Sequence, residues 1–129
     1  MRSNDVADII GDYLKTKHAR VHRAKAPSQK VFPYVVYRIE SVTDSYPSED
    51  MYLNVDIYED PMKSIRVVET LADDIDLGLN HSVILGNGLN LQFEREQRQS
   101  VDAQDLVEAY LVNIRYVVRG YFYNKTEVI

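Results

Sequence analysis

The sequence predicts a single α+β domain in which two helices pack on a mainly antiparallel sheet of four to five strands. Two stretches carry apolar residues at helical spacing, whereas several others alternate in polarity or are rich in β-branched and aromatic residues. The chain has 129 residues, enough for one domain and too few for two comfortable ones. Hydrophobic residues make up 45% of it and charged residues 27%, so a real core can form.

The first helix is expected from Asn4 to Lys17. Ser3 or Asn4 can cap it, and acidic residues in the first turn suit the helix dipole. One apolar stripe follows the helical period: Val6, Ile9, Ile10, Tyr13 and Leu14. Residues 19–25 could then form a short strand with Val21 pointing inward.

The segment around this junction is basic. Six cations fall within sixteen residues, with His18 and His22 beside them: Lys15, Lys17, Arg20, Arg23, Lys25 and Lys30. The segment is either a solvated charged edge or a docking patch for an acidic partner. Salt-dependent assembly would distinguish the two interpretations.

The central strand is predicted from Tyr34 to Thr43, with Pro33 at its start because proline cannot donate a ladder hydrogen bond. A polar turn is expected over residues 44–50. The next strand, Tyr52 to Glu59, alternates cleanly: Leu53, Val55 and Ile57 point one way. These two strands are predicted to pair antiparallel.

A second long helix is predicted from Pro61 to Leu79. Asp60 followed by Pro61 is typical of a helix start, and Gly78 and Asn80 offer the stop. The apolar face is expected to consist of Met62, Ile65, Val68, Leu71 or Ala72, Ile75 and Leu79.

The last third of the chain predicts strands again. A tight turn at residues 86–88 leads into a strand that begins at Leu89 and continues as a wholly polar run, Arg95 to Gln99. A strand that is polar on both faces must leave the core and stand in solvent or in a partner. A long final strand is expected from Leu106 to Tyr123, with its even-numbered residues on one face, and residues 124–129 are expected to be a flexible tail.

Composition limits the function classes. The net charge of −5 makes the chain a poor candidate for an independent nucleic-acid binder. There is no cysteine, hence no disulfide or thiol chemistry, and no apolar run long enough to span a membrane. Ten tyrosines are the one unusual count, and tyrosine suits strands and protein interfaces.

The search for catalytic groups finds little. Four acids in the predicted strands could in principle hold Mg²⁺ as in a nuclease: Asp56, Glu59, Glu94 and Glu96. Exposed acids on strand faces are the preferred interpretation, and His18, His22 and His81 are read as surface or edge histidines. We therefore expect no catalytic residue, no metal and no cofactor, and no enzyme activity.

The order of features resembles the small tail-completion proteins of long-tailed phages, which include tail terminators and tail-to-head joining proteins of Bacillus phages and prophages. After an N-terminal helix come residues 20–21, 26–27 and the run Phe32-Pro33-Tyr34-Val35-Val36-Tyr37. The strand at 53–58, the helix with residues 68–73 and the late strand ending at 115–118 continue the likeness over nearly the whole chain.

The resemblance implies a structural protein of the virion, present in the host cytoplasm during assembly. It implies a homo-oligomeric ring, a hexamer, that sits on the tail tube protein and stops tail growth, or joins the tail to the head connector proteins. DNA would pass through the ring without specific binding. The candidate subunit or partner contacts are Arg95, Glu96, Arg98, Tyr110, Tyr116, Arg20 and Arg23, and the candidate channel-facing acids are Asp44, Glu49 and Asp50, with the cluster at 73–76 as a further possibility.

Two alternatives stay open. The chain could be another oligomeric virion component, such as a connector or tail-tube subunit, which differs in its partner and copy number. It could also be a metal-dependent enzyme of nucleic-acid processing, which would respond to Mg²⁺ and lose activity on Asp56→Ala.

Overall fold

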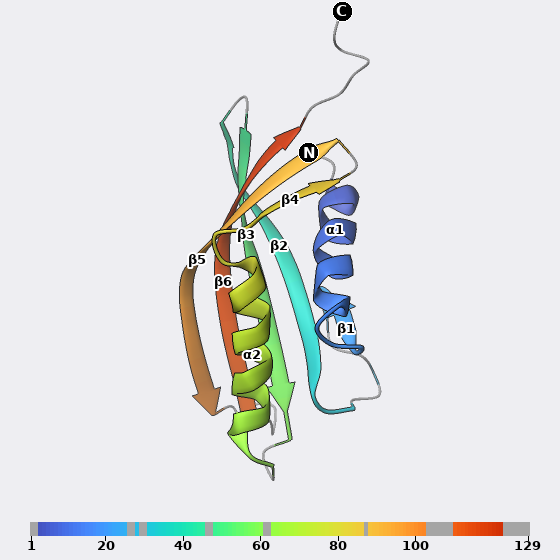
Figure 1. Ribbon diagram of the computed structural model, residues 1–129, viewed down its shortest axis with the longest axis vertical. Coiled ribbons are helices and arrows are strands. Elements are labelled where there is room, and N and C mark those ends of the chain that lie inside the picture. Colours follow the sequence, from blue (N-terminus) through green and yellow to red (C-terminus); the bar gives the residue numbers. More distant parts are fainter. Residues whose placement is uncertain are drawn as a thin grey trace, which may run out of the picture.

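The computed structural model describes residues 3–25, 28, 31–45, 48–60, 63–86, 88–102 and 110–122. Figure 1 shows two helices and a curled sheet, which confirms the predicted α+β class. In chain order the elements are α1 (Ser3–Lys15), β1 (Val21–Arg23), β2 (Tyr34–Ser45), β3 (Ser48–Glu59), α2 (Ile65–Leu79), β4 (Val83–Gly86), β5 (Leu89–Asp102) and β6 (Tyr110–Phe122).

The sheet has six strands in the order β1-β2-β3-β6-β5-β4. Every neighbouring pair is antiparallel except β1 and β2, which run parallel. The prediction of four to five antiparallel strands is therefore close but not exact. The short strand considered over residues 19–25 is present as β1, with three residues, whereas β4 was not predicted as a strand; its four residues are too few to show a clear period in the sequence.

Both helices pack on the same face of the sheet. The core side chains include the predicted stripe of α1, the apolar face of α2 from Val68 onward and alternate residues of β2, β3, β5 and β6. The helix α1 touches distant strands of the sheet: the Tyr37 hydroxyl of β2 donates to the Ala7 carbonyl at 3.1 Å, and Ile9 lies against Gly86 of β4. The sheet thus curls around its helices, and no described helix covers the opposite face (Figure 1).

The start of α2 differs from the prediction. The helix begins at Ile65, and the Ser64 side chain accepts a hydrogen bond from the Arg66 amide. The Lys63 amide donates to the Asp60 carbonyl at 3.0 Å, so Asp60 belongs to a turn before the helix. Residues 61 and 62 lie outside the described part, and Ile65 is exposed rather than buried.

The remaining boundaries shift by a few residues. The helix α1 ends at Lys15, because the amides of residues 16 and 17 bond to carbonyls three residues back. Most of the predicted polar turn at 44–50 is strand, since Asp44 pairs with Glu49 and Ser45 with Ser48. The predicted strand residues 106–109 and 123, and the predicted tail, lie outside the described residues. Neither described helix is both long and apolar enough to cross a bilayer.

Candidate functional site

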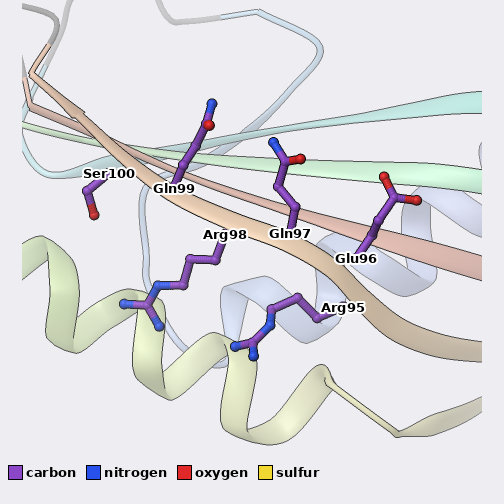
Figure 2. A pocket seen from close by; sticks show the side chains of 6 residues that line it. All are labelled: Arg95, Glu96, Gln97, Arg98, Gln99 and Ser100. Atoms are coloured by element: carbon purple, nitrogen blue, oxygen red, sulfur yellow. The ribbon is translucent and has the colours of Figure 1, made fainter.

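The polar part of β5 is built around a bulge at Glu96. Arg95 pairs with Tyr116 and Gln97 with Arg115, so Glu96 is one residue more than β6 can match. Before the bulge, Phe93 and Arg95 face the helices, and after it Arg98 does so. Figure 2 shows the guanidinium groups of Arg95 and Arg98 directed toward α2, while Glu96, Gln97 and Gln99 point to the other side.

The helix α2 meets this strand with three carboxylates on one side: Glu69, Asp73 and Asp76. The Arg98 guanidinium pairs with Glu69 Oε2 and with Asp73 Oδ1, both at 2.7 Å. Arg95 Nη1 lies 2.6 Å from Asp76 Oδ2, and the Ser100 hydroxyl donates to Glu69. We call these contacts the α2–β5 ion pairs. The segment was predicted to leave the core and stand in solvent or in a partner: Arg95, Glu96, Gln97 and Gln99 are exposed, whereas Arg98 is partly covered by α2.

Arg98 is the central cation of these ion pairs. Burial lowers the pKa of its guanidinium, but the hydrogen bonds to Asp73 and Glu69 more than offset this, so the pKa is raised overall. Arg98 therefore stays charged while it is mostly covered. The predicted partner contacts Arg95 and Arg98 already have carboxylate partners within the chain.

Tyr116 lies in the core, which contradicts its prediction as a partner contact. It is fully buried, and its hydroxyl donates to Asp76 Oδ1 at 2.8 Å. Burial raises the pKa of Tyr116, and the hydrogen bond to Asp76 raises it further. The reason is strand parity, since Tyr116 shares the side of β6 that carries the core residues Val112, Ile114 and Val118. Tyr110, on the same parity at the start of β6, is half-buried opposite Glu59 and Asp102.

The two candidate arginines near β1 have different surroundings. Arg20 is half-buried, and its Nε and Nη2 donate to the carbonyls of Pro33 and Phe32 at 3.0 and 3.4 Å. It holds the segment that leads into β2. Arg23 is exposed on β1 and donates only to the Asn4 side chain among the bonds described. Arg23 is therefore the more accessible of the pair.

The candidate channel acids lie together at one end of the hairpin formed by β2 and β3. Asp44 pairs with Glu49 across the two strands, and Asp50 follows directly. Asp50 Oδ1 lies 3.2 Å from Arg119 Nε of β6. The side chain of Asp44 lies outside the described part of the structure. In the cluster at 73–76, Asp73 and Asp76 belong to the α2–β5 ion pairs.

Sequence reasoning missed the helix-free face of the sheet as one surface. The Arg115 guanidinium lies 3.7 Å from the ring centre of Tyr52, and the rings of Tyr34 and Tyr58 stack at 4.9 Å. Among the described residues this face carries four tyrosines, three arginines and no lysine: Tyr34, Tyr52, Tyr58, Tyr121, Arg38, Arg115 and Arg119. Tyrosine and arginine enrichment with lysine depletion is typical of interface surfaces. The alternation in β3 and β6 was the available signal.

A buried carboxylate, Asp56, lies on that same face. Arg38 donates to its Oδ2 at 3.0 Å and Asn113 to its Oδ1 at 2.6 Å, across three strands. Burial and the neighbouring Asp56 raise the pKa of Tyr58. Both carboxylate oxygens are thus engaged by side chains of the chain itself.

The acids proposed for a magnesium site are not brought together. The register puts Asp56 level with Asn113 and Gln99, whereas Glu94 is level with Tyr52, four residues away along β3. Glu59 accepts a hydrogen bond from the Asp60 amide. Glu96 lies 3.7 Å from Arg115 across the bulge. Within the described ranges, no group of three His, Cys, Asp or Glu residues could hold a metal ion.

The three histidines also lie apart. His18 shares a hydrogen bond with the Pro33 carbonyl at 2.8 Å, and the His22 ring meets the Tyr34 ring edge-on. His81 follows α2, where its amide donates to the Phe93 carbonyl. Each histidine therefore has a structural neighbour of its own.

Comparison with known proteins supports the fold alone. No family model matches the chain. No curated protein matches it. Thirteen chains of solved structures match it. One of them, of a protein designated only by a sequence identifier, shares 15% sequence identity over 93% of each chain, with a TM-score of 0.63.

Proposed function

We propose that this chain is a structural protein of phage virion assembly. In the proposal it forms a ring, a hexamer, that caps the tail tube, joins the tail to the head connector, or does both. It acts without catalysis and without a cofactor. Its place would be the head–tail interface of the virion, reached from the host cytoplasm during assembly.

The observation that carries the proposal is that the sheet ends in two unlike edges. The basic strand β1 forms one edge, and β4 with the polar part of β5 forms the other; in Figure 1 the polar part of β5 lies on the opposite side of the molecule from β1, whereas β4 runs toward α1. A closed ring of identical subunits needs two different surfaces that bind head to tail and close by rotation. Unpaired strand edges are suited to such contacts, because main-chain groups can pair across them.

The acids at the end of the β2–β3 hairpin support a channel role. The backbone positions of Asp44, Glu49 and Asp50 are neighbours there by register, and the chain carries a net charge of −5. An acidic lining would repel DNA phosphates and let DNA pass without being gripped. Tail tube and head connector proteins would then bind the two open ends of the ring.

The nearest alternative is another ring-forming virion component, a connector or tail-tube subunit, which shares the same argument and differs in its partners. The metal-dependent enzyme has less support, because both oxygens of Asp56 are engaged by Arg38 and Asn113.

The test is electron microscopy of lysates from a phage or prophage that lacks this gene. Filled heads beside unattached tails would support a joining role, and overlong tails would support termination. Normal, joined virions would refute tail completion. Restoration of virions by the gene supplied in trans is the control for effects on neighbouring genes.

A further inference from the structure

One stretch of the sheet edge has no neighbour among the described residues. The strand β4 pairs with residues 89–92 of β5, and residues 81 and 82 bond to Phe93. The Asn80 side chain accepts from the Arg95 amide. From Glu96 to Asp102, the described chain pairs with β5 only on its β6 side. This stretch, which we call the β5 edge, lies at the left border of the molecule in Figure 1.

The β5 edge is held in place before any partner arrives. The α2–β5 ion pairs fix Arg95 and Arg98 against the helix, and an open groove lined by residues 95–100 runs along the strand (Figure 2). An edge strand that is already ordered loses less conformational entropy when a second strand adds to it. Its polar side chains also explain how the edge can stay in water without aggregating.

Carboxylates border this groove beside the two arginines that line it. On the α2 side, Glu69 and the largely exposed Asp73 flank Arg98, and on the helix-free side Glu96 is exposed. The side chain of Asp73 is 68% exposed, so its charge is available to a partner as well as to Arg98. The segment that fits here is extended and basic.

The chain itself has such a segment at its other edge. The strand β1 pairs only with β2 among the described residues; Arg23 in this strand and Lys25 just after it are exposed, and Arg23 donates to the Asn4 side chain of α1. Arg23 pairs in register with Tyr37, so its side chain lies on the helix side of the sheet, as Arg98 does. His22 lies on the helix-free side, as Gln97 and Gln99 do.

We propose that the β5 edge of one copy takes the β1 edge of a second copy, which continues the sheet from subunit to subunit. Main-chain hydrogen bonds join the strands, and Arg23 of one copy meets Asp73 and Glu69 of the next. The contact is head to tail, because its two halves are different surfaces. The inference deepens the proposed ring by naming the surfaces that close it.

Disulfide trapping tests this contact even if it is weak. The chain has no cysteine, so each introduced thiol is unambiguous. Neighbouring strands keep Cα atoms about 4.5–5.5 Å apart, within the range that a disulfide spans. We would make His22→Cys, Gln97→Cys and Gln99→Cys singly, because both glutamines share the helix-free side with His22. Oxidised glutathione supplies the oxidant.

The expected pattern is specific to a head-to-tail contact. His22→Cys mixed with Gln97→Cys or Gln99→Cys gives cross-linked dimers and nothing larger, and each variant alone gives no cross-linked dimer. A chain that carries both His22→Cys and one of the glutamine changes gives a ladder beyond the dimer. Gln92→Cys is the matched control, because β4 already covers β5 there.

A charge exchange tests the role of Arg23. In the mixed cross-linking, Arg23→Glu on the His22→Cys chain lowers the dimer yield roughly tenfold, since it turns an attraction into a repulsion. Asp73→Lys on the other chain restores the yield. Lys63→Glu is the control: it reverses an exposed charge before α2 and should leave the dimer yield unchanged.

Three results would overturn the inference: no cross-link in any mixture, dimers from His22→Cys alone, or equal cross-linking through Gln92→Cys. Failure of the proposed function is a separate outcome. Normal virions from the deletion strain together with the expected cross-links would keep the contact and reject tail completion, and the reverse combination would reject the contact alone.

Discussion

The strongest stability prediction concerns Asp76, which joins α2 to two strands. Its carboxylate accepts from the buried Tyr116 hydroxyl at 2.8 Å and pairs with Arg95 at 2.6 Å. Asp76→Ala leaves the Tyr116 hydroxyl buried without an acceptor, which costs about 1–3 kcal/mol. The half-exposed Arg95 pair adds about 0.5 kcal/mol, and the better helix propensity of alanine returns about 0.5 kcal/mol.

The net expectation is a loss of about 2 kcal/mol in the free energy of unfolding, or roughly 8 °C in Tm for a domain of this size. Urea denaturation followed by circular dichroism measures it. Tyr116→Phe is the matched variant: it removes the donor without leaving an unpaired group, and should cost about 1 kcal/mol. In the double variant the two losses should not add, with a coupling of about 1 kcal/mol. An Asp76→Ala protein as stable as the wild type would refute this account of the site.

Three further predictions follow from the same packing. Arg98→Met should lower the free energy of unfolding by about 1–2 kcal/mol, because it removes the ion pair with Glu69. Salt screens such a pair, so the loss should be smaller in 1 M NaCl. An equal loss at both salt concentrations would contradict an electrostatic origin. Gly11→Ala should cost about 1 kcal/mol in thermal unfolding despite the gain in helix propensity, because the new Cβ would lie 2.5 Å from the Tyr37 hydroxyl; a stabilised variant would contradict the close contact. The raised pKa of Tyr116 means that above the ordinary tyrosine value of 10.0 the unfolded chain releases a proton that the folded chain keeps. Stability should therefore fall as pH rises past that value, by at most about 1.4 kcal/mol per pH unit for this group, and Tyr116→Phe should flatten the decline in denaturation series taken at increasing pH.

Much of the fold could be predicted because apolar residues recur at regular helical or strand spacing in the sequence. Helical spacing predicted that Val6 and Ile10 are buried, and strand alternation predicted the same for Leu53 and Val55. All four side chains are fully buried. The strand β4 carried too few residues for a period to show. The capping role of Ser64 was hidden by the stronger start signal at residues 60–61, which the chain uses for a turn.

The candidate contacts were harder to predict, because the sequence does not show what lies opposite a polar side chain. Arg95 and Arg98 look free in the sequence, but α2 brings carboxylates to them. Tyr116 looked like one more surface tyrosine, although its own strand parity placed it with the core residues Ile114 and Val118. The pairing of Arg115 with Tyr52 joins residues 63 positions apart, which no local pattern can reveal.

The bulge at Glu96 also bears on how sequences of this fold should be aligned and shortened. Because Glu96 is one residue more than β6 can match, its removal would leave a regular strand in which the residues after it keep their partners and their faces. A relative that is one residue shorter here would carry the counterpart of Arg98 two positions after that of Arg95, not three. An alignment that moves the gap beyond residue 98 would shift the residues between the bulge and the gap by one position and assign their side chains to the wrong face of the sheet.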